Sequence, residues 1–298
     1  MPQFAIIDAP SILGLRPTGV QYLPEALKAA GLMKKLKAEY AGRILSLPYN
    51  PQRDKSTLLL NPDSIKAFSL QLAGKVISVI NKKQFPIVLG GDCSILIGNL
   101  LALRQMGSSS SSSRYGLFFI DGHADFYQPE ASLTGEVADM DLAIVSGRGP
   151  DILTDIEGLK PLVLDKDVVV FGCRDRDQAA SYGSQDVYKT SMHIFDLEKV
   201  LTLGIRHAAS LDIEKLMNND FAGFWIHLDA DVLDDAIMPA VDYRLNGGLS
   251  FSDLSELLKI ILGTGCAVGM NITIFNPLLD VDGSITRRFV SSIVAGLS

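Results

Sequence analysis

The sequence has few of the features that would place it outside a reducing, aqueous compartment. Its 298 residues include three cysteines, at positions 93, 173 and 266, which are too few and too dispersed for a disulfide framework. No run of 18 uncharged apolar residues occurs, so we expect no transmembrane helix and no membrane partner. The start, Met1 to Phe4, lacks the basic residue and cleavage site of a signal peptide. These absences predict a cytoplasmic protein.

An excess of basic residues is also lacking. The 27 lysines and arginines are outnumbered by 34 aspartates and glutamates, which gives a formal net charge of −7. Proteins that bind nucleic acid need a basic face to meet the phosphates. Nucleic acid is therefore not an expected partner.

Apolar runs alternate with amphipathic segments along the whole chain, which is 47% hydrophobic and 20% charged. This alternation predicts an α/β fold: a single domain over residues 1–298, with three α/β/α layers and a mostly parallel sheet. Apolar runs predict strands at 4–7, 43–47, 86–89, 116–120, 167–171, 223–228 and 266–273. Helical spacing predicts helices at 23–40, 65–82, 94–106, 252–262 and 284–297.

Two short motifs carry the strongest chemical signal. Asp121, His123 and Asp125 alternate directly after one predicted strand, and Asp229 and Asp231 alternate after another. Alternate residues of a strand point to one side, so each set can converge. Carboxylates with one imidazole suit Mn²⁺ or a similar divalent cation. A single aspartate at such a position is commonly a helix cap or turn residue, but the two motifs together predict a metal site.

Cys93 and His227 lie beside these motifs. Cys93 follows Gly90-Gly91-Asp92 at the expected start of a helix, where the helix dipole lowers a thiol pKa. It is either a ligand or a small buried side chain. His227 precedes Asp229 with the same strand parity, and either supports the site or packs in the core.

Five segments give the chain a resemblance to the ureohydrolase superfamily of arginases, agmatinases and formimidoylglutamases. They are GGDCS at 90–94, DGHAD at 121–125, GCRD at 172–175, DADVLD at 229–234 and MNITIFNPLLD at 270–280. The resemblance covers nearly the whole chain. It implies an arginase-like fold, a small-molecule substrate, and a homo-oligomer that is a trimer or hexamer.

The resemblance also implies two Mn²⁺ ions per chain. A bridging hydroxide would attack an sp² amidine carbon, and Asp125 would accept a hydrogen bond from it and help to move its proton. Because Cys93 stands where the family has a histidine, Zn²⁺ or Fe²⁺ can take the place of Mn²⁺. The implied ligands are Cys93, Asp121, Asp125 and Asp229 for one ion, and Asp121, His123, Asp229 and Asp231 for the other.

Two further departures concern catalysis. Ala138 aligns with the family's proton-shuttling histidine, and an alanine transfers no proton. Glu136, Asp139 or Asp141 could take its place, and Glu136 and Asp139 join Asp125 as the predicted catalytic residues. Ile274 aligns with the glutamate that anchors a guanidinium group, so the usual anchor is lost.

These departures argue against ordinary arginine as the substrate. The expected function is metal-dependent hydrolysis of a linear C–N bond in an amidine, guanidino or related molecule. The alternatives are a catalytically silent or one-metal homologue with a binding or assembly role, and a deacetylase-like zinc hydrolase. The acidic stretch at 134–141 resembles the family's substrate-binding segment, and it either lines the site or is a solvated loop. Arg148 could equally pair with a loop aspartate. The candidate substrate-binding residues are Tyr127, Thr134, Asp141, Arg148, Asp177 and Tyr243.

Overall fold

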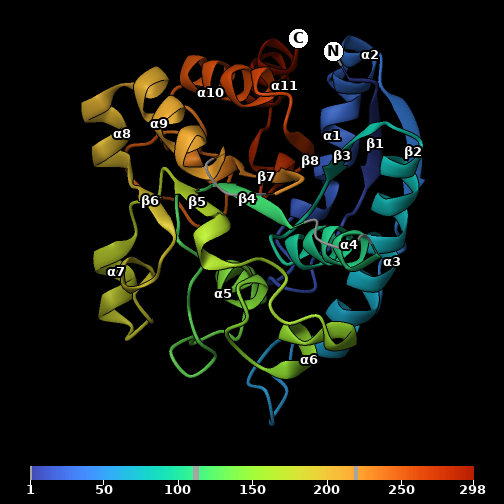
Figure 1. Cartoon of the computed structure of the whole chain (residues 1–298), viewed down its shortest axis with the longest axis vertical. Helices are drawn as coiled ribbons and strands as arrows, with labels where there is room; N and C mark the ends of the chain where they lie inside the picture. Colours follow the sequence, from blue (N-terminus) through green and yellow to red (C-terminus); the bar gives the residue numbers. More distant parts are fainter. Residues whose placement is uncertain (1, 110–113, 218–220) are drawn as a thin grey trace.

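The computed structural model describes residues 2–109, 114–217 and 221–298. Eight parallel strands form one sheet in the order β2-β1-β3-β8-β7-β4-β5-β6 (Figure 1). The strands are β1 (Phe4–Asp8), β2 (Glu39–Arg43), β3 (Phe85–Leu89), β4 (Tyr115–Ile120), β5 (Val168–Phe171), β6 (His193–Phe195), β7 (Gly223–Asp229) and β8 (Ala267–Thr273).

Helices cover both faces of the sheet, because both faces of its strands are apolar. Val169 and Phe171 of β5 belong to one buried cluster, whereas Val168 and Val170 belong to the other. This alternation follows from the two-residue period of a strand. The first cluster packs against α1 (Leu23–Ala29), α2 (Leu32–Leu36), α8 (Leu197–Leu203), α9 (Ile205–Met217), α10 (Phe251–Gly263) and α11 (Ser284–Leu297). The second packs against α3 (Pro62–Asn81), α4 (Ile95–Ser109), α5 (Asp141–Val145) and α6 (Asp151–Thr154).

The predicted three-layer class is confirmed, but two predicted elements are wrong. The helix predicted over 23–40 is interrupted at Gly31, whose φ of 93° is left-handed, and ends at Leu36, before the left-handed Lys37. The following Glu39–Arg43 then forms the edge strand β2, in place of the strand predicted at 43–47. The three-residue strand β6 was not predicted from the sequence, because it is too short to show a period.

The four central strands end at the same level. Leu89 of β3 pairs with Ile272 of β8, which pairs with Leu228 of β7, which in turn pairs with Ile120 of β4. The segments that follow these strands therefore meet at one edge of the sheet. In parallel sheets this edge is where ligands bind.

No helix within the described residues is long and apolar enough to cross a membrane.

Asp212 of α9 gives a stability prediction remote from that edge. It is fully buried and neither carboxylate oxygen has a hydrogen-bond partner. Burial raises the pKa of Asp212 to about 9, against the lowering effect of Lys199 and Lys215. Between pH 4 and pH 9 the unfolded chain therefore releases a proton that the folded chain keeps, and this destabilises the fold as pH rises.

We expect Asp212→Asn to raise the free energy of unfolding, by on the order of 1–2 kcal/mol at pH 8 and by much less near pH 4. Urea denaturation at both pH values measures the gain. Glu214→Gln, on the exposed face of the same helix, is the matched control and should show no gain. An equal gain at both pH values would contradict the prediction.

Candidate metal centre

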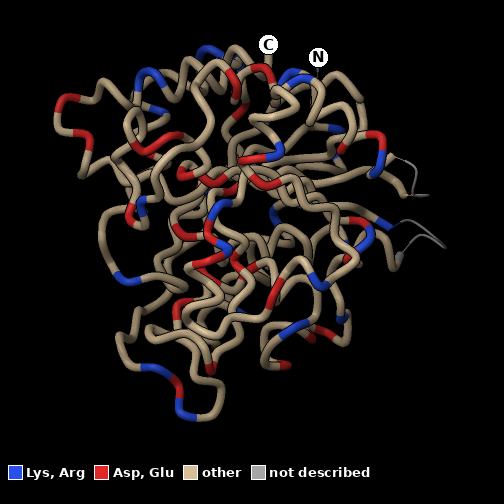
Figure 2. Tube along the Cα trace, turned by 90° about the vertical axis from the view of Figure 1, so that its left-hand side faces the viewer, with Lys and Arg blue, Asp and Glu red and all other residues tan. Residues whose placement is uncertain are grey.

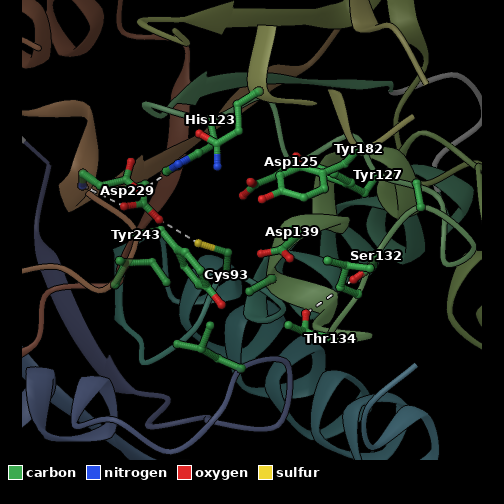
Figure 3. Close-up of a pocket in the computed structure, with 17 residues that line it drawn as sticks. Cys93, His123, Asp125, Tyr127, Ser132, Thr134, Asp139, Tyr182, Asp229 and Tyr243 are labelled. Carbon is green, nitrogen blue, oxygen red and sulfur yellow. Dashed lines mark hydrogen bonds and ion pairs between the residues drawn. The ribbon is translucent and has the colours of Figure 1, made fainter. Parts of the chain in front are cut away.

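The predicted ligands meet at the common edge of the central strands (Figure 3). Cys93 follows β3, Asp121 to Asp125 follow β4, and Asp229 ends β7 with Asp231 in the short 3-10 turn behind it. All four carboxylates and the thiol are more than nine-tenths buried. Acidic residues are scattered over the chain and also gathered near the middle of the trace (Figure 2).

Cys93 lies at the centre of this group. Its Sγ is 2.8 Å from Asp229 Oδ2 and 3.2 Å from Thr273 Oγ1. Potential ligand atoms of Cys93, Asp121 and Asp229 lie within 4.8 Å of one another. Burial, followed by the charge of Asp229, raises the pKa of Cys93 well above its ordinary value. The expectation that a helix dipole lowers this pKa is therefore wrong for the protein without a bound cation.

His123 forms the other end of the centre. Its Nδ1 is 2.9 Å from Asp231 Oδ2, and its ring lies within 4.8 Å of ligand atoms of Asp121 and Asp125. Burial lowers the pKa of His123, but the charge and hydrogen bond of Asp231 outweigh it and raise the pKa to about 9. Without a metal the ring is thus a cation paired with Asp231. A metal would have to displace this proton.

The loops that carry the ligands are fixed by hydrogen bonds. The Asp92 carboxylate accepts from Ser11 Oγ at 2.8 Å and from Ser94 N at 2.9 Å, which holds the turn around Cys93. The Asp175 carboxylate accepts from Ala124 N at 3.1 Å. Arg174 Nη2 donates to the Asp231 carbonyl at 2.8 Å. A Cβ on Gly91 would lie 1.8 Å from the Ser11 carbonyl oxygen, so this turn requires glycine.

The remaining carboxylates lack sufficient countercharge. Burial, then repulsion from neighbouring carboxylates, raises the pKa of Asp121 and of Asp125 well above the ordinary value. The same is true of Asp229, where burial and then Asp231 are responsible. Asp121 Oδ2 is buried without a hydrogen-bond partner. A buried, unpaired carboxylate is costly, so this donor set fits a divalent cation.

A chain of hydrogen bonds fixes the tautomer of His227. Trp225 Nε1 can only donate, and it lies 2.7 Å from Asn271 Oδ1. The Asn271 amide nitrogen therefore donates to His227 Nδ1, 2.8 Å away. Burial lowers the pKa of His227 to about 3, so the ring is neutral and carries its proton on Nε2.

His227 Nε2 is 3.5 Å from Asp121 Oδ2, and neither atom has another partner. Because the nitrogen carries a proton, it cannot ligate a metal, but it can donate to Asp121 after a small closure. The ring also stacks on Phe119, with centroids 4.5 Å apart. His227 is thus packed in the core and also directed at the candidate metal centre. Both alternatives that the sequence left open therefore describe its position.

A pocket of about 170 Å³ opens above the ligands. Nine predicted site residues line it: Cys93, His123, Asp125, Tyr127, Thr134, Asp139, Asp229, Asp231 and Tyr243. Most of its outer wall comes from the segment after β4, within which Asp141–Val145 is helical. Figure 3 shows Tyr127, Tyr182 and Tyr243 around the opening.

Five predicted site residues do not line the pocket; one of them, Asp121, is buried among the other ligands. Arg148 makes a two-pronged ion pair with Asp165, at 2.8 and 2.6 Å, and lies outside the pocket lining. Asp177 is exposed on α7 (Arg176–Ser181), outside the lining. Glu136 is buried behind the wall, where it accepts from Arg16 N at 3.0 Å and from the Tyr243 hydroxyl. Asp141 is fully buried beneath the pocket.

Sequence reasoning missed three polar lining residues, Ser132, Gln178 and Tyr182. Ser132 lies in the segment already assigned to the wall, and its hydroxyl lies 3.4 Å from that of Thr134. Gln178 and Tyr182 come from α7 and its end, 46 and 50 residues beyond Ser132. Their approach depends on tertiary structure and has no local signal.

Ile274 closes the pocket floor beside Cys93 with an apolar side chain. Its φ is 68°, a left-handed value that a β-branched residue seldom adopts. Its N–H donates to the Gly91 carbonyl at 2.8 Å, which holds the strained turn in place. Such strain costs about 1–3 kcal/mol and is concentrated at functional sites.

Fold and centre together define an α/β protein with a carboxylate-rich site at the carboxyl ends of parallel strands. A model described as the arginase family matches residues 2–298. The chain is 30% identical over 297 residues to the arginase of Staphylococcus aureus strain COL, covering 97% of this chain and 94% of the relative. It is 30% identical over 280 residues to the arginase of Bacillus subtilis strain 168, covering 93% and 91%.

A solved structure agrees with this assignment. The arginase from Bacillus caldovelox matches with a TM-score of 0.87 at 26% identity, covering 100% of this chain and 99% of that one. The chain therefore belongs to the arginase family of hydrolases, which confirms the resemblance drawn from its motifs.

The tautomer of His227 gives a prediction for metal affinity. We expect His227→Asn to weaken the binding of Mn²⁺ or Zn²⁺ by about 10–100-fold, because Asp121 loses a supporting donor. His227→Gln should retain most of the affinity, since its amide nitrogen reaches the position of Nε2. Calorimetric titration of the metal-free chain measures both. Equal affinities in the two variants would show that His227 does not support Asp121.

Proposed function

We propose that this protein is a metal-dependent hydrolase of a linear C–N bond in an amidine, guanidino or related small molecule, and that ordinary arginine is not its substrate. The observation that carries the proposal is the buried set of carboxylates, imidazole and thiol directly beneath an open pocket. Family membership supports the hydrolytic chemistry.

Two divalent cations are expected in this centre. Cys93, Asp121, Asp125 and Asp229 would hold one, and Asp121, His123, Asp229 and Asp231 the other. When bound, such ions supply Lewis acidity and make water nucleophilic at neutral pH. Mn²⁺ suits the carboxylates, and the thiol of Cys93 shifts the preference toward Zn²⁺ or Fe²⁺.

Asp139 is the proposed proton-transfer group in place of the absent histidine at Ala138. It lines the pocket, whereas Glu136 is turned away and engaged by Tyr243. Burial, then the charge of Glu136, raises the pKa of Asp139 to about 7, against the effect of His123. A pKa near the working pH is what a general acid or base requires.

The pocket wall supports a small substrate with positive charge or hydrogen-bond donors. Asp125 and Asp139 offer carboxylates, and Ser132, Thr134 and Tyr127 offer hydroxyls. Ile274 removes the family's carboxylate from the floor. A cationic group is therefore held from the side of Asp139, and an apolar or uncharged part of the substrate faces Ile274.

A catalytically silent homologue with a binding or assembly role is the second candidate. The observations that favour it are Ala138 and Ile274, which lack the polar side chains of the family pattern. A homo-oligomer is expected for either candidate, since the resemblance implies one, and sedimentation analysis would measure its size.

Metal content and turnover separate the two candidates. Protein purified without chelators and reconstituted with Mn²⁺, Zn²⁺ or Fe²⁺ should hold two metals per chain by elemental analysis. It should then hydrolyse at least one guanidino, formimidoyl or hydroxyguanidino compound, and Asp121→Asn should abolish turnover. The surface variant Glu214→Gln is the control. Full metal occupancy without turnover of any compound would favour the silent homologue.

The role of Asp139 predicts a pH profile. If its carboxylate accepts a proton during the reaction, activity should rise as pH increases through about 7, the pKa at which Asp139 loses its proton. Asp139→Asn should lower kcat by about 10²–10⁴-fold and flatten that limb of the profile, with a smaller change in KM. If activity of Asp139→Asn still rises through about pH 7, Asp139 is not the group that causes this rise.

A further inference from the structure

Asp141 is a buried carboxylate that the function described so far does not use. It begins α5, beneath the pocket, and its solvent exposure is 0%. Neither of its carboxylate oxygens accepts a hydrogen bond. The Leu142 N–H lies close enough to lower its pKa somewhat but does not reach hydrogen-bonding geometry, and burial prevails in raising the pKa.

The neighbours of Asp141 show where its carboxylate is aimed. One of its oxygens lies within 4.8 Å of Cys93 Sγ and of an Asp125 oxygen, and those two atoms also lie within 4.8 Å of each other. Two carboxylates and a thiol thus surround one point in the interior. Their arrangement favours a cation, because two buried carboxylates without one repel each other.

A protonated Asp141 bonded to its neighbour would be the simplest alternative. That arrangement requires a hydrogen bond between the Asp141 and Asp125 carboxylates, and neither oxygen of Asp141 has such a partner. His227 cannot serve as an alternative ligand, because its Nε2 carries the proton.

We propose that Asp141 is a metal ligand, and that a divalent cation is held between Cys93, Asp125 and Asp141. This inference rests on the proposed function, since it concerns the Cys93 half of the same centre. It places an additional carboxylate where the cysteine replaces an imidazole. The resulting sulfur and oxygen donor set favours Zn²⁺, Co²⁺ or Fe²⁺ over Mn²⁺.

Metal binding by the full chain tests the proposal without reference to activity. Zn²⁺ and Co²⁺ are titrated calorimetrically into the metal-free protein, and Co²⁺ binding is also followed through the thiolate-to-cobalt absorption band. Asp141→Asn, which keeps the size of the side chain, should weaken one of the two binding events at least tenfold. The cobalt band should then require correspondingly more Co²⁺, and Cys93→Ser should abolish it.

The stability of the same variants gives a second readout. Without metal, Asp141→Asn should melt at a higher temperature than the wild type, because a repelling buried carboxylate is gone. With saturating Zn²⁺ it should gain less than the wild type does. Asp212→Asn is the matched control, since it also neutralises a buried, unpartnered carboxylate. It should raise the melting temperature and leave metal affinity unchanged.

The possible outcomes separate the two proposals. Two metals bound by Asp141→Asn with wild-type affinity would overturn the role of Asp141 and leave the proposed function intact. A wild-type chain that binds no metal would overturn both. If Asp141→Asn does not fold, Asp141→Glu replaces it: retention of both metals with altered affinity for one supports the proposal, and unchanged affinity for both contradicts it.

Discussion

Repulsion among buried carboxylates is the constraint on which this site depends. Asp121, Asp125 and Asp229 end neighbouring strands or follow them closely, and burial together with their mutual charge raises the pKa of each. The imidazole of His123 offsets mainly Asp231. A fold that concentrates acids in this way gives up stability unless a cation joins them. The proposed cation would relieve this repulsion, so its binding would be linked to the stability of the fold.

The sheet makes this concentration of charge possible. Its four central strands end level, so their following segments converge without long loops. Hydrogen bonds that Asp92 and Asp175 accept, and one that Arg174 donates, then hold those segments in place. Ligands fixed in this way lose little entropy when a cation binds, and they cannot move apart to relieve their repulsion. Rigid ligands would therefore favour cation binding, but they lower the stability of the fold when no cation is bound.

The sequence predicted that Asp121, His123 and Asp125 converge, and ligand atoms of the three do lie within 4.8 Å of one another. The strand period that suggested it is not the cause, because β4 ends at Ile120, Asp125 has a left-handed φ of 44°, and Asp231 lies in a 3-10 turn after β7. The outer wall was harder to predict, because irregular backbone sets the direction of each side chain there. Asp139 faces the pocket while Glu136, three residues earlier, faces away. Gln178 and Tyr182 approach from a distant helix, and no local pattern reveals them.

The residues that depart from the family pattern lie next to one another in the fold, and this helps to explain why they are there. Cys93, Ala138 and Ile274 line one pocket, and Asp139, Asp141 and His227 add polar groups around or beneath it. Asp141 and His227 carry unsatisfied buried atoms, and Ile274 has a strained backbone. In a protein that binds nothing, such features only destabilise the fold, and an apolar residue at 141 would be the more stable choice. Their presence together is better explained by an altered centre that still binds a cation than by the decay of an unused one.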